Sequence, residues 1–175
     1  MSFGTEPLMD GRVPPQNLEA EQAVLGSILL ESEALVTVME RLRTEDFYSV
    51  AHQRIFDAIV SLAEDNQPLD LITLTARLRD LNQLEEVGGA TYLAKLTGAV
   101  PTAANVEYYA QIVEEKSLLR RLIRTATQIV ANGYAESEDV RLLLHDAEQR
   151  IMELTGYRGS HGFVSIRDVL MEVFE

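Results

Sequence analysis

The sequence contains no cysteine among its 175 residues. Disulfides, thiolate metal sites and cysteine nucleophiles are therefore excluded, which fits a reducing compartment. Long hydrophobic runs are also missing, because uncharged apolar stretches such as residues 22–30 fall far short of the roughly 20 residues that span a bilayer. Residues 1–10 have neither a basic segment nor an apolar one, so they do not form a secretory signal. These absences favour a cytoplasmic protein.

Positive charge is scarce as well, with 15 Lys and Arg against 28 Asp and Glu and a net charge of −13. Affinity for nucleic acids comes mainly from Lys and Arg that neutralise phosphates, so the overall charge disfavours a protein that grips DNA or RNA. Apolar residues make up 46% of the chain, which is enough for a core and too many for disorder. The length suits one large domain or two small ones.

Motifs that carry chemistry are also absent. There is no G-x-x-x-x-G-K-[ST] loop for phosphates and no G-x-G-x-x-G fingerprint. The three histidines, His52, His145 and His161, are far apart in sequence, and we expect each to be structural or solvent-facing. No Glu is followed three residues later by His, as carboxylate-bridged metal sites in helical bundles require. The sequence therefore predicts no catalytic, cofactor-binding or metal-binding residue.

The sequence does contain a helical pattern, which begins after an N-terminal arm. Residues 1–16 combine Gly, Pro and polar residues without a period, which predicts a disordered N-terminal arm. Residues 17–100 predict a small globular head of short helices joined by brief turns, with no run of alternation long enough for a strand. Asn17 and Asp70 are expected to cap two of these helices.

Two further helix starts are expected in the head. One helix is predicted from Ser32, with Leu35, Val36 and Met39 facing inward. The pair Asn82 and Glu85 has the spacing of a capping box, which predicts a helix start at Asn82.

Residues 101–156 predict a long antiparallel αα-hairpin. Pro101 stops the preceding element, and Asn105 can cap a helix that starts at Val106. The helical pattern then runs to Asn132 and Gly133, which are typical of a C-terminal stop, so this helix has about 27 residues and a length of roughly 40 Å. A second helix is predicted over residues 139–154, after a short acidic turn.

The two hairpin helices differ in the width of their apolar faces. The second carries a narrow seam suited to one neighbouring helix, namely Val140, Leu144, Ala147, Ile151 and Leu154. The first carries a broader stripe, namely Ile112, Leu118, Leu119, Leu122, Ile123, Ala126, Ile129 and Val130. One seam does not need so wide a face, so we expect a second contact with the head, with another copy of the chain or with a different protein.

Residues 157–175 predict a flexible linker and the start of a further helix. Two glycines and polar residues keep the linker flexible. The helix pattern is still running at Glu175, and so short a helix is marginal alone. We therefore expect it to dock on another subunit, or the chain to be part of a longer protein.

Four stretches of the sequence together resemble the N-terminal domain of the bacterial replicative DNA helicase, the DnaB-type hexameric family. They are Pro14–Gly26, Asp46–Tyr48 with Ala51–Phe56, Leu84–Gly89, and Pro101–Lys116. The resemblance implies a helical head, a hairpin and a linker helix that leads to a RecA-like motor domain. That motor, which uses ATP and magnesium, is missing here. The fragment is therefore expected to have no cofactor, to hydrolyse no ATP and to unwind no DNA.

The resemblance also implies partners. In this family the N-terminal domains pair through hairpins and heads into a trimer-of-dimers collar, so a homo-oligomer from dimer to hexamer is expected. The collar docks the C-terminal domain of primase and contributes to interaction with the helicase loader. Candidate primase-docking residues are Tyr92, Ile123 and Ile129. Hairpin packing and self-association are assigned to Leu119, Leu122, Val140, Leu144 and Ile151. Contact of the linker helix with a neighbouring motor is assigned to Val169, Leu170, Val173 and Phe174.

One alternative rests on a basic patch formed by Lys116, Arg120, Arg121 and Arg124. It would make the chain a nucleic-acid-binding helical module. However, the acidic residues Glu107, Glu114 and Glu115 lie at helical spacing from this patch and offer it ion pairs. We therefore expect little or no direct DNA binding by this fragment.

Overall fold

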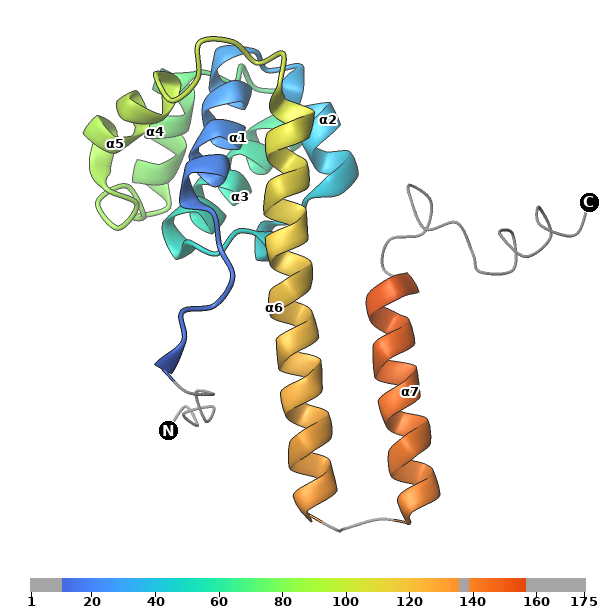
Figure 1. The fold of residues 1–175 in the computed structure, drawn as a ribbon. Helices are drawn as coiled ribbons and strands as arrows, with labels where there is room; N and C mark the ends of the chain where they lie inside the picture. Colours follow the sequence, from blue (N-terminus) through green and yellow to red (C-terminus); the bar gives the residue numbers. More distant parts are fainter. Residues whose placement is uncertain (1–10, 136–138, 157–175) are drawn as a thin grey trace, which may run out of the picture. The chain divides into compact units, whose positions relative to one another are not determined.

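The structure, a computed structural model, describes residues 11–135 and 139–156, and within these ranges every regular element is helical (Figure 1). The predicted all-α fold class is thus confirmed. The elements are α1 (Leu18–Leu30), α2 (Ala34–Arg41), the 3-10 turn η2 (Thr44–Asp46), α3 (Val50–Glu64), α4 (Leu71–Asp80), α5 (Gly89–Thr97), α6 (Val106–Ala135) and α7 (Val140–Gly156). The predicted linker and linker helix, with Val169, Leu170, Val173 and Phe174, lie outside the described residues.

The chain divides into two compact units within α6, after Arg120. We call described residues 11–120 the head, and described residues 121–135 and 139–156 the hairpin. The sequence places a boundary at residue 100, where the long helix is about to begin. Contacts place the division later, because Val106, Ala110 and Val113 in the first half of α6 are buried in the core of the head.

The core of the head forms where α1 packs against α2, α3 and α5, and where α4 packs against α3 and α5. Its largest fully buried side chains include Leu25, Ile28, Phe47, Ile55, Ile59, Leu62, Leu74, Leu78 and Leu93. At Gly26, α1 approaches the end of α5 so closely that an added Cβ would lie 2.3 Å from the Leu96 carbonyl oxygen. Glycine is required there because any side chain would collide with backbone.

Side chains cap the starts of three head helices. Asn17 Oδ1 accepts from the Ala20 amide at 2.9 Å, and the Ser49 hydroxyl accepts from the His52 amide. Asp70 Oδ1 accepts from the Ile72 and Thr73 amides, each at 2.9 Å. The hydrogen bond from the Thr73 amide, with that from Ile72, lowers the pKa of Asp70. The predicted caps at Asn17 and Asp70 are confirmed.

The capping box predicted at Asn82 is wrong, because Asn82 ends a helix instead of starting one. Its φ is +56°, in the left-handed region that Asn tolerates better than most residues. The Asn82 amide donates to the Arg79 carbonyl and the Gln83 amide donates to the Leu78 carbonyl. These are the two hydrogen bonds of a Schellman motif, which satisfy the last carbonyls of α4.

The inward face predicted for α2 is only partly right. The helix begins at Ala34, and Leu35 is buried, but Val36 is 67% exposed and Met39 is also exposed. The buried stripe follows Leu35 and Val38, since the contact with α1 selects one side of a helix only eight residues long.

Arg41 ties α2 to α6. Its guanidinium bonds to Glu107 at 2.8 Å and to Glu114 at 3.4 Å. The hydrogen bond with Glu107 and the charge of Glu114 raise the pKa of Arg41. Two acidic residues expected beside the basic patch are therefore paired with α2.

The predicted end of the long helix is also wrong, because α6 passes through Gly133 to Ala135 and has 30 residues. Gly133 does not have a positive φ, and nothing lies within 4 Å of the position its Cβ would take. A glycine within a helix costs about 1 kcal/mol relative to Ala, which a long helix tolerates. The second helix starts as expected, with Asp139 Oδ1 accepting from the Arg141 amide at 2.8 Å.

Candidate interaction surfaces

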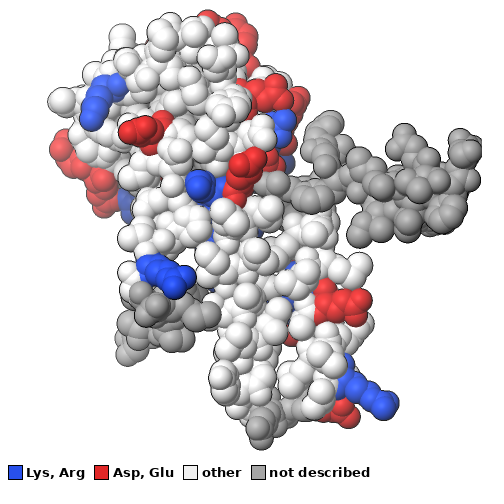
Figure 2. All heavy atoms as spheres, in the orientation of Figure 1, with Lys and Arg blue, Asp and Glu red and all other residues white. Residues whose placement is uncertain are grey.

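The hairpin exposes a large part of its apolar side chains. Among residues 121–135 and 139–156, none is buried, although both helices carry apolar residues at helical spacing. The exposed ones are Leu122, Ile123, Val130, Tyr134, Val140, Leu142, Leu144, Ile151 and Met152. In Figure 2 few charged side chains cover the second half of α6 on the side that faces the viewer. Clustered exposed apolar groups of this kind mark interfaces.

A groove of about 320 Å³ lies between the second half of α6 and α7. Its lining comes from Ile129, Asn132, Gly133, Val140, Leu143, Leu144, Asp146 and Ala147. Most of these residues are apolar, and the polar side chains are one amide and one carboxylate. Such walls suit the apolar side chains of another protein, since few groups are available to orient a polar ligand.

The structure brings some of the predicted hairpin residues together. Ile129 is half-buried and lines the groove with Val140 and Leu144, although Leu144 is still 66% exposed. Leu122, Ile123 and Ile151 are exposed in the hairpin, and Leu119 is exposed at the end of the head. All of these side chains have surface left for a partner, and the roles assigned to them stay predictions.

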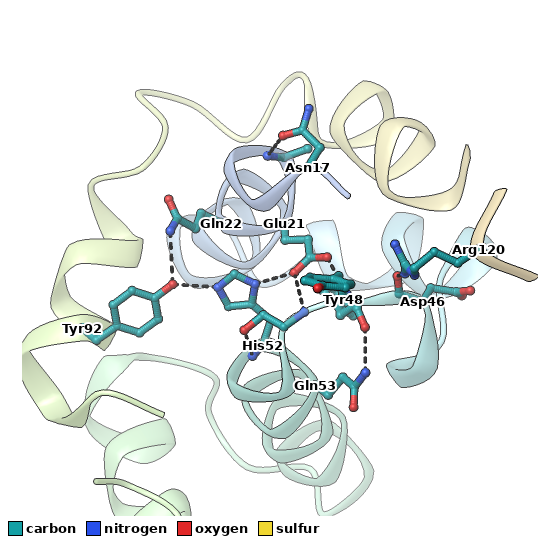
Figure 3. Close-up of polar contacts among 12 residues, drawn as sticks. Asn17, Glu21, Gln22, Asp46, Tyr48, His52, Gln53, Tyr92 and Arg120 are labelled. Atoms are coloured by element: carbon teal, nitrogen blue, oxygen red, sulfur yellow. Dashed lines mark hydrogen bonds and ion pairs between the residues drawn. The ribbon is translucent and has the colours of Figure 1, made fainter. Parts of the chain in front are cut away.

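Tyr92, the third candidate for primase docking, is half-buried and bonded inside the head (Figure 3). Its hydroxyl lies 2.6 Å from His52 Nε2 and accepts from Gln22 Nε2 at 3.2 Å. The planes of the Tyr92 and His52 rings are nearly parallel, at 10°, and their centroids lie 6.1 Å apart. Whatever contact Tyr92 makes outside the chain, its hydroxyl is already used within it.

His52 and Tyr92 belong to a partly buried network with Glu21 and Gln22, which we call the polar clasp (Figure 3). The Glu21 carboxylate is 1% exposed and accepts from the Tyr48 amide at 2.6 Å and the Ser49 amide at 3.3 Å. It also lies 2.5 Å from His52 Nδ1. These contacts compensate a buried carboxylate for the water it has lost.

The direction of the hydrogen bonds in the clasp follows from what each group can do. An ionised carboxylate only accepts, so we assign the hydrogen to His52 Nδ1. Nε2 of the ring then pairs with the Tyr92 hydroxyl, whose oxygen accepts from Gln22. Each of these groups is satisfied, and His52 lies buried in the head, bonded to Glu21 and Tyr92. No local pattern in the sequence indicates this network, because Glu21 and Tyr92 are far from His52 along the chain.

A second cluster, which we call the α6 anchor, consists of Asp46, Ser117 and Arg120. Ser117 Oγ donates to the Asp46 carboxylate at 2.6 Å. Arg120 donates to the Asp46 carbonyl at 2.6 Å and to the Pro15 carbonyl at 2.8 Å. Its guanidinium also lies 5.6 Å from the centre of the Tyr48 ring, within range of a cation–π contact.

The α6 anchor changes two expectations. Arg120, assigned to a basic patch, instead bonds to backbone carbonyls of the head. The arm predicted over residues 1–16 is held at Pro15 by the same guanidinium, and residues 1–10 lie outside the described part of the chain. Sequence reasoning missed this role because an Arg on a helix next to other cations gives no sign of its partners.

In the described part of the chain, no three His, Asp or Glu side chains gather in a way that could hold a metal ion. No described helix is both long and apolar enough to cross a bilayer.

Comparison with known proteins identifies the family. The sequence model of the DnaB-like helicase N-terminal domain matches residues 13–115. The chain belongs to this family. The resemblance inferred from the four sequence stretches is therefore confirmed, and two of them supply Glu21, Tyr48 and His52 around the polar clasp.

The chain matches only part of the length of its relatives in the DnaB family. The chain is 52% identical over 168 residues to the replicative DNA helicase DnaB of Geobacillus stearothermophilus, a match that covers 96% of the chain and 37% of that helicase. The chain thus spans little more than a third of the length of such relatives.

Solved structures agree with the match to the DnaB N-terminal domain. The crystal structure of this domain from Mycobacterium tuberculosis is 48% identical, with a TM-score of 0.76, over 81% of the chain and 99% of that structure. A DnaB-like replicative helicase, described with its interactions with primase, is 28% identical with a TM-score of 0.67, over 91% of the chain and 35% of that structure.

Proposed function

We propose that this chain is the collar domain of a replicative DNA helicase, which assembles copies of the helicase and recruits primase without catalysing a reaction itself. The observation that carries the proposal is the hairpin, whose described residues bury none of their large apolar side chains. Burial of apolar surface contributes roughly 25 cal/mol per Å², so this surface favours association.

Self-association is the first part of the proposal. Two antiparallel helices cannot bury both apolar faces on one another, whereas two such hairpins can form a four-helix arrangement with a shared core. The residues assigned to this contact are Leu119, Leu122, Val140, Leu144 and Ile151. Pairs of copies would then assemble as a trimer of dimers.

Docking of primase is the second part. It is supported by a similar helicase whose structure is described with its interactions with primase. Ile129 lines the groove, Ile123 is 47% exposed on α6, and Tyr92 lies on α5. An apolar segment of the primase C-terminal domain would suit the groove, and a helicase loader would use the same collar.

Catalysis is assigned to the part of the helicase outside this match. We propose that the motor domain uses ATP and magnesium in the bacterial cytoplasm and that this chain contributes no turnover. The purified chain should hydrolyse ATP no faster than buffer does. Turnover that follows the chain through purification would contradict the proposal.

Direct DNA binding is not part of the proposal, because Arg120 already bonds within the head and the net charge is −13. Fluorescence anisotropy with labelled single-stranded DNA should stay flat even at low salt. Binding that weakens steeply as salt rises would favour the nucleic-acid-binding alternative.

The main experiment is native mass spectrometry of the chain, with and without the C-terminal domain of its cognate primase. We expect oligomers of the chain alone and a species that contains both proteins. Oligomers that ignore primase would limit the proposal to assembly. A monomer that binds nothing would overturn it.

A matched pair of variants locates the surface. Leu144→Asp places a charge on the exposed apolar face of the hairpin, and we expect it to shift the oligomer to monomer. Ile72→Asp is the control, because Ile72 is 80% exposed on α4 of the head, away from the hairpin sequence. Equal loss of oligomer in both variants would show that general destabilisation, and not the hairpin face, is responsible.

A further inference from the structure

Residues 46–49, which connect η2 to α3, are held by side chains from three helices. Arg120 of α6 donates to the Asp46 carbonyl, and Gln53 of α3 donates to the Phe47 carbonyl at 2.7 Å. Glu21 of α1 accepts from the amides of Tyr48 and Ser49. Four consecutive residues thus each have a backbone group bonded to a side chain of a neighbouring helix.

The buried Phe47 side chain also holds this segment in place. Its side chain is 1% exposed, and its ring centre lies 5.0 Å from that of Phe56. Neither the backbone nor this ring can shift without breaking a contact inside a closely packed core. Residues 46–49 therefore act as a rigid crosspiece within the head.

One side of the crosspiece leads to α5 through the polar clasp (Figure 3). The Glu21 carboxylate joins the crosspiece to His52, and His52 joins it to Tyr92. Loss of the Tyr92 hydroxyl would leave Nε2 of a buried imidazole without its hydrogen-bond partner. Because an unpaired buried polar group is costly, the ring would reorient and disturb the Glu21 carboxylate.

The other side of the crosspiece leads to α6 through the α6 anchor. Ser117 bonds to the Asp46 carboxylate, and Arg120 bonds to the Asp46 carbonyl. Arg120 is also the last residue of the head before α6 continues into the hairpin. A shift of the crosspiece would therefore change the bonds at the base of the hairpin helix.

We propose that the polar clasp and the α6 anchor form one coupled unit, which links the edge of α5 at Tyr92 to the base of the hairpin helix. Glu21 and His52 are the positioning residues that join the two ends. A partner that binds at Tyr92 would then affect the hairpin base, a consequence that rests on the proposed function. The coupling itself is a property of the single chain and needs no partner.

A double-mutant cycle on the 175-residue chain tests the coupling. Tyr92→Phe removes only a hydroxyl from the clasp, and Ser117→Ala removes only a hydroxyl from the anchor. From urea unfolding, we expect the unfolding constant to rise about tenfold for Tyr92→Phe and about 30-fold for Ser117→Ala. The double variant should reach less than about 100-fold, whereas independent sites would give about 300-fold.

The control pairs Ser117→Ala with Tyr108→Phe. Tyr108 is an exposed tyrosine on the same helix, and it is outside both clusters. Tyr108→Phe should change the unfolding constant little, and in the double variant its factor should simply multiply with the factor for Ser117→Ala. The coupling is refuted if the Tyr92 pair multiplies in the same way as this control pair.

Hydrogen exchange in Tyr92→Phe gives a second measurement that needs no further variant. After correction for global stability, the amides of Tyr48 and Ser49 should exchange about tenfold faster, and the side-chain signals of Arg120 should shift. The Thr73 amide, capped by Asp70, should not change. Unchanged exchange at Tyr48 and Ser49 would overturn the proposal. Both measurements use the chain without primase. The coupling can therefore be tested even if the chain neither binds primase nor forms oligomers.

Discussion

The head and the hairpin are both built from amphipathic helices, but they differ in what covers the apolar faces. In the head, Leu25, Ile59 and Leu78 are fully buried by neighbouring helices of the same chain. In the hairpin, Leu122, Leu144 and their neighbours stay exposed over the described residues. Apolar periodicity therefore indicates that a helix face packs against another surface. It does not indicate whether that surface belongs to the same chain or to a partner.

The polar contacts of the two regions differ in the same way. In the head, bonds such as Ser117 to Asp46 join residues 71 positions apart. In the hairpin, side-chain bonds such as those of Arg150 with Asp146 and of Gln128 with Asn132 join residues only four positions apart. The geometry of the head is thus specified by the single chain, whereas the hairpin has surface available for a partner.

The largest expected contrast comes from cutting back one apolar side chain in each region. Phe47→Ala should destabilise the chain by about 3–5 kcal/mol, because it opens a cavity in a filled core. Leu144→Ala should change the stability of the monomer by no more than about 0.5 kcal/mol, because the side chain is mostly exposed. Urea unfolding at low protein concentration measures both. If both variants lost a similar free energy of unfolding, Leu144 would have to be packed as tightly as Phe47.

Glycines in α1 and α6 sharpen the contrast. Gly26→Ala should cost about 3 kcal/mol, since the new Cβ would meet the backbone oxygen of Leu96. Gly133→Ala should instead stabilise by up to about 1 kcal/mol, because the site is open and Ala favours the helix. Thermal unfolding of the two variants should shift in opposite directions. A stable Gly26→Ala variant would show that α1 and α5 can separate at little cost.

Two hydroxyls on the same helix give a smaller contrast. Ser117→Ala removes a buried hydrogen bond to a carboxylate and should cost about 2 kcal/mol. Thr127→Ala removes a hydroxyl that bonds only to the Ile123 carbonyl of its own helix, and should be neutral within about 0.5 kcal/mol. Denaturant midpoints compare the pair. Equal effects would argue that the α6 anchor adds nothing to the head.

The smallest effect is a dependence on pH at the start of α4. The pKa of Asp70 is lowered in the folded state, so its contribution to stability is complete above its unfolded value of about 4 and is lost as pH falls through the folded value. Asp70→Asn keeps a cap that does not titrate. The urea midpoint of the unmodified chain should therefore fall relative to the variant as pH drops below about 4. If the urea midpoints of the unmodified chain and of Asp70→Asn changed in parallel with pH, the lowered pKa of Asp70 in the folded state would be contradicted.

Much of the fold could be predicted because local signals agreed with it. The caps at Asn17 and Asp70, the helix α3 and the two long helices all follow from spacing and turn chemistry. The errors occurred where one local signal had two meanings. Asn82 can start a helix or end one in the left-handed region, and Gly133 can stop a helix or lie within it.

The candidate sites were less predictable than the fold. Apolar spacing indicates Ile129, Val140 and Leu144, and the structure places all three on one groove. No sequence pattern joins Glu21, His52 and Arg120 into a network. Each is a common polar residue on a helix, and nothing in its near sequence indicates the partner it meets.

The sequence by itself determined the all-helical class, the family and the positions of most helix starts, because these depend on neighbours within one or two turns. Only the tertiary structure decided that α6 belongs partly to the head, that Arg120 holds Pro15, and that Glu21 and His52 meet in the core. The physical reason is that a buried polar group needs a partner, and packing alone decides which distant residue supplies it.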